Sequence, residues 1–180
     1  MFEIIYNNII VKSQYLTPTQ TKNQPLVSGF EQTNNNYYTL IMYDPDTKHG
    51  DYVHWLIINI KNNINDGNIL IPYKGPAPPI NTGIHRYIFL LFKQDNLINK
   101  NNLLNIDRIF NIKDLLNKIG LNIEPINKVF FTSSYQTQIQ IAGKYKVRTR
   151  KHKIQKNKAK KKSKRRKNKT RKLLNKSYNY

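Results

Sequence analysis

The residues best suited to binding chemistry lie in the stretch YKGPAPPINTGIHRYIFLLF, residues 73–92. Its prolines and glycines restrict the path of a loop, and His85 and Arg86 follow at the end of that loop. Both side chains donate hydrogen bonds to anions, and histidine also serves as a general acid or base. The apolar run that comes next is typical of a buried strand. The stretch is therefore either a binding site in front of a strand or only a turn.

Two further groups of polar residues precede this loop. Asp44 and Asp46 flank a proline, an arrangement common in turns, where carboxylates accept hydrogen bonds from backbone amides. His54 stands at the start of an apolar run, where a lone histidine is more often structural than a ligand. Arg86 comes one residue after His85, so on a strand it points to the opposite face. We expect Arg86 to pair with Asp46.

The elements that would position these residues are mainly short strands. Apolar segments rich in Ile, Val, Tyr and Phe alternate with turn sequences, which favours strands over helices. We expect strands at 2–6, 37–43, 53–60, 85–92 and 128–134, with a further candidate at 138–142. Many strands with one late helix indicate an antiparallel sandwich or barrel.

One helix is predicted at 112–121. Its apolar residues follow helical spacing, and Gly120 is placed to end it. These apolar residues are Ile112, Leu115, Leu116 and Ile119.

The 180-residue chain is long enough for one domain with a sizeable core, and its charge divides it into two parts. Residues 1–143 hold 12 Lys and Arg against 10 Asp and Glu, a net charge of +2. Residues 144–180 hold 19 Lys and Arg and no acidic residue, so the formal net charge of +21 belongs mainly to them. We expect a folded domain at 1–143 and a disordered Lys/Arg-rich tail at 144–180.

Composition also narrows the class of protein. The absence of cysteine excludes disulfides, a thiolate nucleophile and a zinc-thiolate site, and it fits a reducing compartment. The N-terminal MFEIIYNNIIVKSQ has an acidic residue where a signal peptide needs basic ones, and no stretch reaches the ~18 apolar residues of a membrane span. We expect a cytoplasmic protein, with the nucleus or a virion as alternative destinations set by the basic tail.

Three ordered blocks resemble the phosphatidylethanolamine-binding proteins, also called Raf-kinase-inhibitor-like proteins. They are YTLIMYDPDT (38–47), HWLIINI (54–60) and GPAPPINTGIHRYIFLLF (75–92), preceded by LTPTQTKNQP (16–25), which is similar to the family's N-terminal segment. The resemblance implies an all-β Greek-key sandwich of antiparallel sheets with one or two short helices and a small anion pocket at one end. The abundance of Asn, Ile and Lys is compatible with an AT-rich genome, and with the short domain it suggests a homologue carried by a large DNA virus.

The resemblance also implies which residues form the pocket. The ligand-binding set is Asp44, His54, Gly75, Pro78, Gly83 and His85, with Asp46 and Arg86 in structural roles beside it. A phosphate headgroup needs several donors that converge in a partly dry cavity, and two histidines with loop amides would supply them. Asp44 would orient one imidazole and raise its protonated fraction. No cofactor, metal or catalytic residue is implied.

Two classes of function fit these features. The first is a non-enzymatic binding or regulatory protein for phospholipid headgroups or phosphorylated ligands, with a kinase or a protease as a partner inhibited by surface binding. The alternative is a hydrolase of phosphate esters that uses His54 and His85 as acid and base. The sequence has no nucleophile elbow, no metal-ligand cluster and no Gly-rich phosphate loop. We therefore expect the binding protein.

The basic tail has several possible roles. The run KKKSKRRKNKTRK fits a nuclear-localisation signal, a nucleic-acid-binding arm or an electrostatic membrane anchor, and the plain alternative is a solubilising tail. We favour binding to nucleic acid or to an anionic membrane, because each phosphate that is neutralised releases a counterion.

Overall fold

The computed structural model describes residues 1–30, 36–103, 106–121 and 124–136. The strands are β1 (Glu3–Tyr6), β2 (Ile9–Ile10), β3 (Leu26–Ser28), β4 (Tyr37–Asp44), β5 (Asp51–Ile60), β6 (Asn68–Ile71), β7 (Ile84–Gln94), β8 (Ile109–Phe110) and β9 (Asn127–Ser134). The helices are α1 (Ile112–Lys118) and the 3-10 turns η1 (Ile64–Asp66) and η2 (Lys100–Leu103). Within the described residues, no helix is long and apolar enough to cross a membrane.

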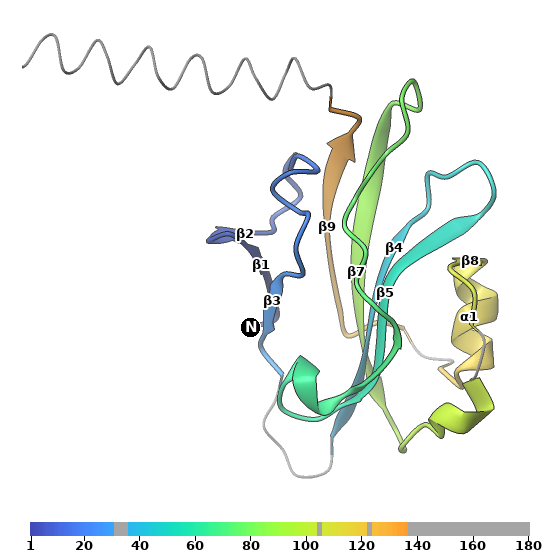
Figure 1. Cartoon of the computed structure of the whole chain (residues 1–180). Coiled ribbons are helices and arrows are strands. Elements are labelled where there is room, and N and C mark those ends of the chain that lie inside the picture. The colour runs from blue at the N-terminus through green and yellow to red at the C-terminus, as the bar shows by residue number, and fades with distance from the viewer. Residues whose placement is uncertain (31–35, 104–105, 122–123, 137–180) are drawn as a thin grey trace, which may run out of the picture. The chain divides into compact units, whose positions relative to one another are not determined.

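Two antiparallel sheets build the fold. The larger has the strand order β6-β5-β4-β7-β9, with β8 added on β5, and the smaller has the order β2-β1-β3. Figure 1 shows the small sheet on one side of the large sheet and α1 on the other side. This arrangement confirms the expected β-rich, antiparallel fold class with a short helix.

The central strands of the large sheet are buried on both faces, which explains the apolar run after the loop. Tyr87, Phe89 and Leu91 of β7 belong to the cluster that packs against the N-terminal strands. The alternate residues, Ile88, Leu90 and Phe92, belong to a second cluster that includes residues of α1. A strand covered on both faces needs apolar side chains at every position rather than at every second one.

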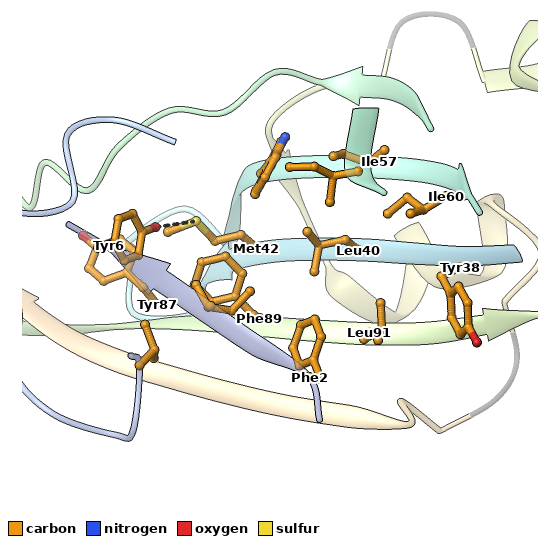
Figure 2. Packing of buried hydrophobic residues seen from close by; sticks show 14 of the residues in the cluster. Phe2, Tyr6, Tyr38, Leu40, Met42, Ile57, Ile60, Tyr87, Phe89 and Leu91 are labelled. Carbon is orange, nitrogen blue, oxygen red and sulfur yellow. Dashed lines mark hydrogen bonds between the residues drawn. The ribbon is translucent and has the colours of Figure 1, made fainter. Parts of the chain in front are cut away.

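The first of these clusters fixes the N-terminal strands onto the large sheet. Figure 2 shows Met42 and Phe89 of the large sheet close to Tyr6 of β1, whose hydroxyl lies 4.0 Å from the sulfur of Met42. Tyr6 also packs edge-on against Phe131 of β9, with ring centroids 5.6 Å apart. The aromatic residues at alternating strand positions are therefore core residues.

Most of the predicted elements are present, with shifted ends. The predicted helix is shorter than expected, because Ile119 caps it and Gly120 takes a φ of +77°. The sequence reading did not identify β2, β3, β6 or β8, which have two to four residues each. The candidate strand at 138–142 and the boundary near residue 143 lie outside the described residues, of which Met1–Tyr135 form one unit.

Two loops meet at one end of the large sheet. The β4–β5 turn and the loop that precedes β7 lie at the same end, because Tyr43 of β4 pairs with Ile88 near the start of β7. Figure 1 shows both loops at the top of the sheet. The polar residues singled out in the sequence lie in or beside these loops.

Candidate binding site

A cavity of about 610 Å³ lies between the two loops. Its lining comes from the β4–β5 turn, β5, the loop before β7, the start of β7, and β8. Of the residues implied by the resemblance, the lining includes Asp44, Asp46, His54, Gly75, Pro78 and His85. Gly83 and Arg86 are not among the lining residues.

Asp44, His85 and Thr82 form a hydrogen-bonded chain inside the cavity. The Oδ2 atom of Asp44 accepts from Nδ1 of His85 at 2.7 Å, and both side chains are almost fully buried, at 3% and 2% exposure. The hydroxyl of Thr82 lies 2.8 Å from the carbonyl oxygen of Pro79 and 2.8 Å from Nε2 of His85. Both ring nitrogens of His85 thus have a hydrogen-bond partner within the protein.

Burial and hydrogen bonding have opposite effects on the pKa of Asp44. Burial raises the pKa of Asp44, while the hydrogen bonds from His85 and from the backbone amide of Asp46 oppose that rise. The Asp44–His85 contact agrees with the expectation that a carboxylate orients one imidazole. The imidazole that it orients is that of His85.

His54 reaches the cavity because β5 is irregular at this point. Met42 of β4 pairs with Trp55 and Tyr43 pairs with Val53, so His54 has no partner on β4. An extra residue in one strand re-aims the side chains around it. His54 and Trp55, although adjacent, therefore both pack against aromatic rings of the first cluster: His54 lies 5.1 Å from the ring of Tyr87, and Trp55 lies 5.5 Å from Tyr73.

The ring of His54 is held in one orientation by the backbone of Lys74. Nδ1 of His54 donates to the carbonyl of Lys74 at 2.6 Å, and the amide of Lys74 donates to the carbonyl of His54 at 2.9 Å. Burial, with a smaller contribution from the nearby positive charge of Arg108, lowers the pKa of His54 from 6.5 to about 4. At neutral pH, Nε2 of His54 is therefore an acceptor rather than the second donor that we expected.

Arg108 is a residue of this site that the sequence reading missed. Its guanidinium donates to the carbonyls of Val53 at 3.1 Å, His54 at 3.3 Å and Pro72 at 2.9 Å. These contacts join the irregular part of β5 to the loop before β7. The carbonyl of His54 also accepts from the amide of Lys74, so the guanidinium adds a second donor there, and no sequence motif marks a residue 54 positions away as that donor.

Replacement of Arg108 by methionine is expected to lower the free energy of unfolding by about 1–3 kcal/mol, because three backbone carbonyls lose a hydrogen bond from a charged donor. Removal of the positive charge is also expected to raise the pKa of His54 above about 4, as measured by NMR titration. Arg86→Met is the matched control, since Arg86 is exposed and bound to one carboxylate. A folded Arg108→Met protein as stable as the control would contradict this role.

The expected pair between Arg86 and Asp46 is present. Nε and Nη2 of Arg86 donate to the carboxylate at 3.0 and 2.7 Å, and the backbone amide of Arg86 donates to it at 2.8 Å. The pKa of Asp46 is lowered by these hydrogen bonds. The pair ties the β4–β5 turn to the start of β7, outside the buried part of the cavity.

Two glycines of the loop have conformational roles. A Cβ at Gly75 would lie 2.8 Å from the carbonyl oxygen of Thr21 and 2.9 Å from that of Lys22, so the loop can approach the N-terminal segment only with glycine here. Gly83 has a φ of +82° and open space around it, so its backbone conformation rather than contact with a ligand explains the glycine.

The rim of the cavity carries two exposed lysines. Nζ of Lys74 donates to the hydroxyl of Tyr52 at 2.8 Å and lies 5.2 Å from the centroid of that ring. Within the described residues, neither Lys48 nor Lys74 takes part in an ion pair. Tyr52, Lys74 and Thr82 also line the cavity and were not identified from the sequence.

Comparison with known proteins places this geometry in context. The family model described as "Phosphatidylethanolamine-binding protein" matches residues 13–124. The chain is 42% identical over 147 residues to a "26 kDa secreted antigen" of Toxocara canis, across 77% of this chain and 50% of that protein. The chain thus spans about half the length of this relative. The viral source suggested by the composition gains no support from this relative.

Solved structures share the fold. A carboxypeptidase Y inhibitor, determined in complex with its cognate proteinase, superposes with a TM-score of 0.65 at 23% identity, covering 75% of this chain and 83% of that one. A phosphatidylethanolamine-binding protein from Plasmodium vivax superposes with a TM-score of 0.59 at 21% identity, covering 75% and 85%. At these identities, the likeness establishes the fold alone.

Proposed function

Because the chain belongs to the phosphatidylethanolamine-binding protein family, we propose that it is a non-enzymatic binding protein whose cavity takes a phosphate-bearing ligand, such as a phospholipid headgroup. The observation that carries the proposal is the buried chain of Asp44, His85 and Thr82 inside a cavity with two lysines at its rim. A phosphate oxygen could replace the hydroxyl of Thr82 as the partner of Nε2 of His85, and a hydrogen bond to an ionised oxygen is stronger than one to a hydroxyl.

The state of His54 favours headgroups that also carry a donor. A neutral His54 accepts a hydrogen bond at Nε2, and Nδ1 is already used by Lys74. An ammonium group, or the protonated oxygen of a phosphate monoester, can donate to this nitrogen, whereas a fully ionised phosphate cannot. Phosphoethanolamine combines both kinds of group and is therefore the preferred probe.

His85→Ala is expected to weaken phosphoethanolamine binding by ~1.5–3 kcal/mol, the range for a hydrogen bond to a charged group. Isothermal titration calorimetry of the full chain with phosphoethanolamine and with inorganic phosphate measures the change. His49→Ala is the matched control, because His49 is an exposed histidine of the same cavity lining. Unchanged affinity in a folded His85→Ala protein would contradict the assignment of the pocket.

The alternative function is a hydrolase of phosphate esters that uses His54 and His85. A general base works best with a pKa near the operating pH, and the pKa of His54 is about 4. Both nitrogens of His85 are already hydrogen-bonded. Steady turnover of phosphate esters by the purified chain, lost in His54→Ala, would replace the binding proposal with the hydrolase.

Inhibition of a protease or a kinase by surface binding is a further proposal of the binding class. The carboxypeptidase Y inhibitor that shares this fold was determined in complex with its cognate proteinase, which supports this proposal. Inhibition assays with the full chain and its His85→Ala variant would separate the two ideas, because surface inhibition does not require an occupied pocket.

For residues 144–180 we propose binding to polyanions, either nucleic acid or an anionic membrane, because they hold 19 Lys and Arg and no acidic residue. We further propose a cytoplasmic location, with nuclear or virion association through this basic segment. The printed name of the Toxocara canis relative describes a secreted protein, so detection of this chain in the medium of its source cells would contradict the proposed location.

A further inference from the structure

The mouth of the cavity combines exposed apolar side chains with unpaired positive charges. Ile80 is 62% exposed and Ile109 is 47% exposed, and both line the cavity although they come from different parts of the chain. Ala77 and Pro79 are exposed beside Ile80 in the same lining. Large apolar side chains in contact with water at the rim of a polar cavity indicate a surface that is covered when the protein acts.

The exposed isoleucines are held in place by the fold. Ile80 lies in a turn that the amide and the hydroxyl of Thr82 close by donating to the carbonyl of Pro79. Ile109 belongs to β8, where it pairs with Tyr52 of β5. Because Thr82 is also hydrogen-bonded to His85, the turn that presents Ile80 is connected directly to the interior of the cavity.

The charges around the mouth select the kind of partner. Lys48 and Lys74 are exposed at the rim and lack ion-pair partners within the described residues. The acidic residues of the lining have partners within the fold, since Asp44 is hydrogen-bonded to His85 and Asp46 forms an ion pair with Arg86. Apolar side chains interleaved with lysines fit the interface of a membrane, where the apolar groups enter the headgroup region and the lysines meet anionic lipids.

We infer that the protein docks on an anionic phospholipid bilayer with the mouth of its cavity facing the lipid, so that Ile80 and Ile109 enter the headgroup region. The inference rests on the proposed function, since it states how a headgroup still attached to its bilayer reaches the cavity.

The orientation is tested directly with single fluorescent labels. The chain contains no cysteine, so Ile80→Cys, Ile109→Cys and Ile69→Cys each give one site for an environment-sensitive dye in the full chain. Ile69 is the matched control, because it is an exposed isoleucine, at 57%, on the strand β6 and outside the cavity lining. With vesicles of phosphatidylcholine, phosphatidylethanolamine and phosphatidylserine, we expect a blue shift at positions 80 and 109 and none at position 69.

The contribution of the isoleucines is measured by vesicle co-sedimentation of the full chain. Ile80→Asn combined with Ile109→Asn is expected to lower the partition coefficient at least about tenfold, the factor for partial burial of one or two such side chains. Ile69→Asn is expected to change it less than about twofold, as a surface substitution outside the contact. The dependence on salt, which reports mainly the basic segment, should be the same in all three proteins.

The outcomes separate this inference from the proposed function. If the dye at positions 80 and 109 stays in water while the chain binds vesicles, the basic segment holds the membrane alone or the face serves a protein partner, and the inference is overturned. If the wild-type chain does not bind soluble phosphoethanolamine but the dyes at positions 80 and 109 still shift to the blue on vesicles, the headgroup pocket is rejected. The docking of this face on the membrane is then supported without it.

Discussion

Replacement of Asp44 by alanine is expected to lower the free energy of unfolding at neutral pH by about 3–5 kcal/mol, the cost of removing a carboxylate that takes part in two hydrogen bonds, one from a backbone amide and one with a buried imidazole. Asp44 and His85 are 3% and 2% exposed, and their side chains meet at 2.7 Å. Without the carboxylate, the buried Nδ1 of His85 loses its hydrogen-bond partner. The amide of Asp46 also loses its acceptor. Denaturant unfolding followed by circular dichroism measures the change.

Asp46→Ala is the matched control for this prediction. Asp46 lies in the same turn and pairs with Arg86, but the arginine side chain is 54% exposed. Pairs in contact with water contribute about 0–1 kcal/mol, so we expect a much smaller loss. In the double variant Asp44→Ala, His85→Leu, the loss should be smaller than the sum of the two single losses, because neither group is left alone. Equal stability of the Asp44→Ala and Asp46→Ala proteins would refute the buried pair.

Acidification from pH 7 to pH 4 is expected to lower the free energy of unfolding by about 3 kcal/mol through the titration of His54 alone. The pKa of His54 is lowered from 6.5 to about 4, mainly by burial. The unfolded chain has the higher pKa and therefore takes up the proton first as the pH falls. The contribution of neutral His54 to the stability of the fold is thus complete above about pH 6.5 and is lost as the pH falls toward 4. Below the folded pKa, both states are protonated and His54 adds no further dependence.

His54→Asn isolates this effect, because asparagine can still donate to the carbonyl of Lys74 but does not titrate. Unfolding free energies of both proteins at a series of pH values give the difference directly. We expect the curves to diverge between pH 4 and pH 6.5 and to run parallel above that range. A wild-type curve parallel to that of the variant through the whole series would mean that the pKa of His54 is not lowered by folding. That result would contradict the assignment of Nε2 as a hydrogen-bond acceptor at neutral pH.

Much of the fold could be read from local patterns. The apolar runs that became β4, β5, β7 and β9 were found within a few residues of their ends, because each has enough β-branched and aromatic residues to identify it without its neighbours. The short strands were missed. A strand such as β8, with two residues, has no pattern of its own and exists only because β5 offers it hydrogen-bonding partners.

Some features of the candidate site could likewise be predicted from local sequence, and others could not. The residue types and their order along the chain pointed to Asp44, His54 and His85, and side-chain alternation on a strand predicted the pair between Arg86 and Asp46. The different hydrogen-bond partners of the two histidines were not predictable. His85 contacts the carboxylate of Asp44, whereas His54 is buried and bonded to the backbone of Lys74, with its pKa lowered to about 4.

The sequence by itself determined the β-rich fold class, the uneven distribution of charge, and the set of side chains able to form a site, because these depend on composition and on spacing within short segments. Only the tertiary structure decided that His54 turns into the cavity, that Arg108 supports the irregular part of β5, and that Ile80 and Ile109 meet at one mouth. The physical reason is that strand register, burial and contacts between residues far apart in the chain arise only when the two sheets and their loops are assembled.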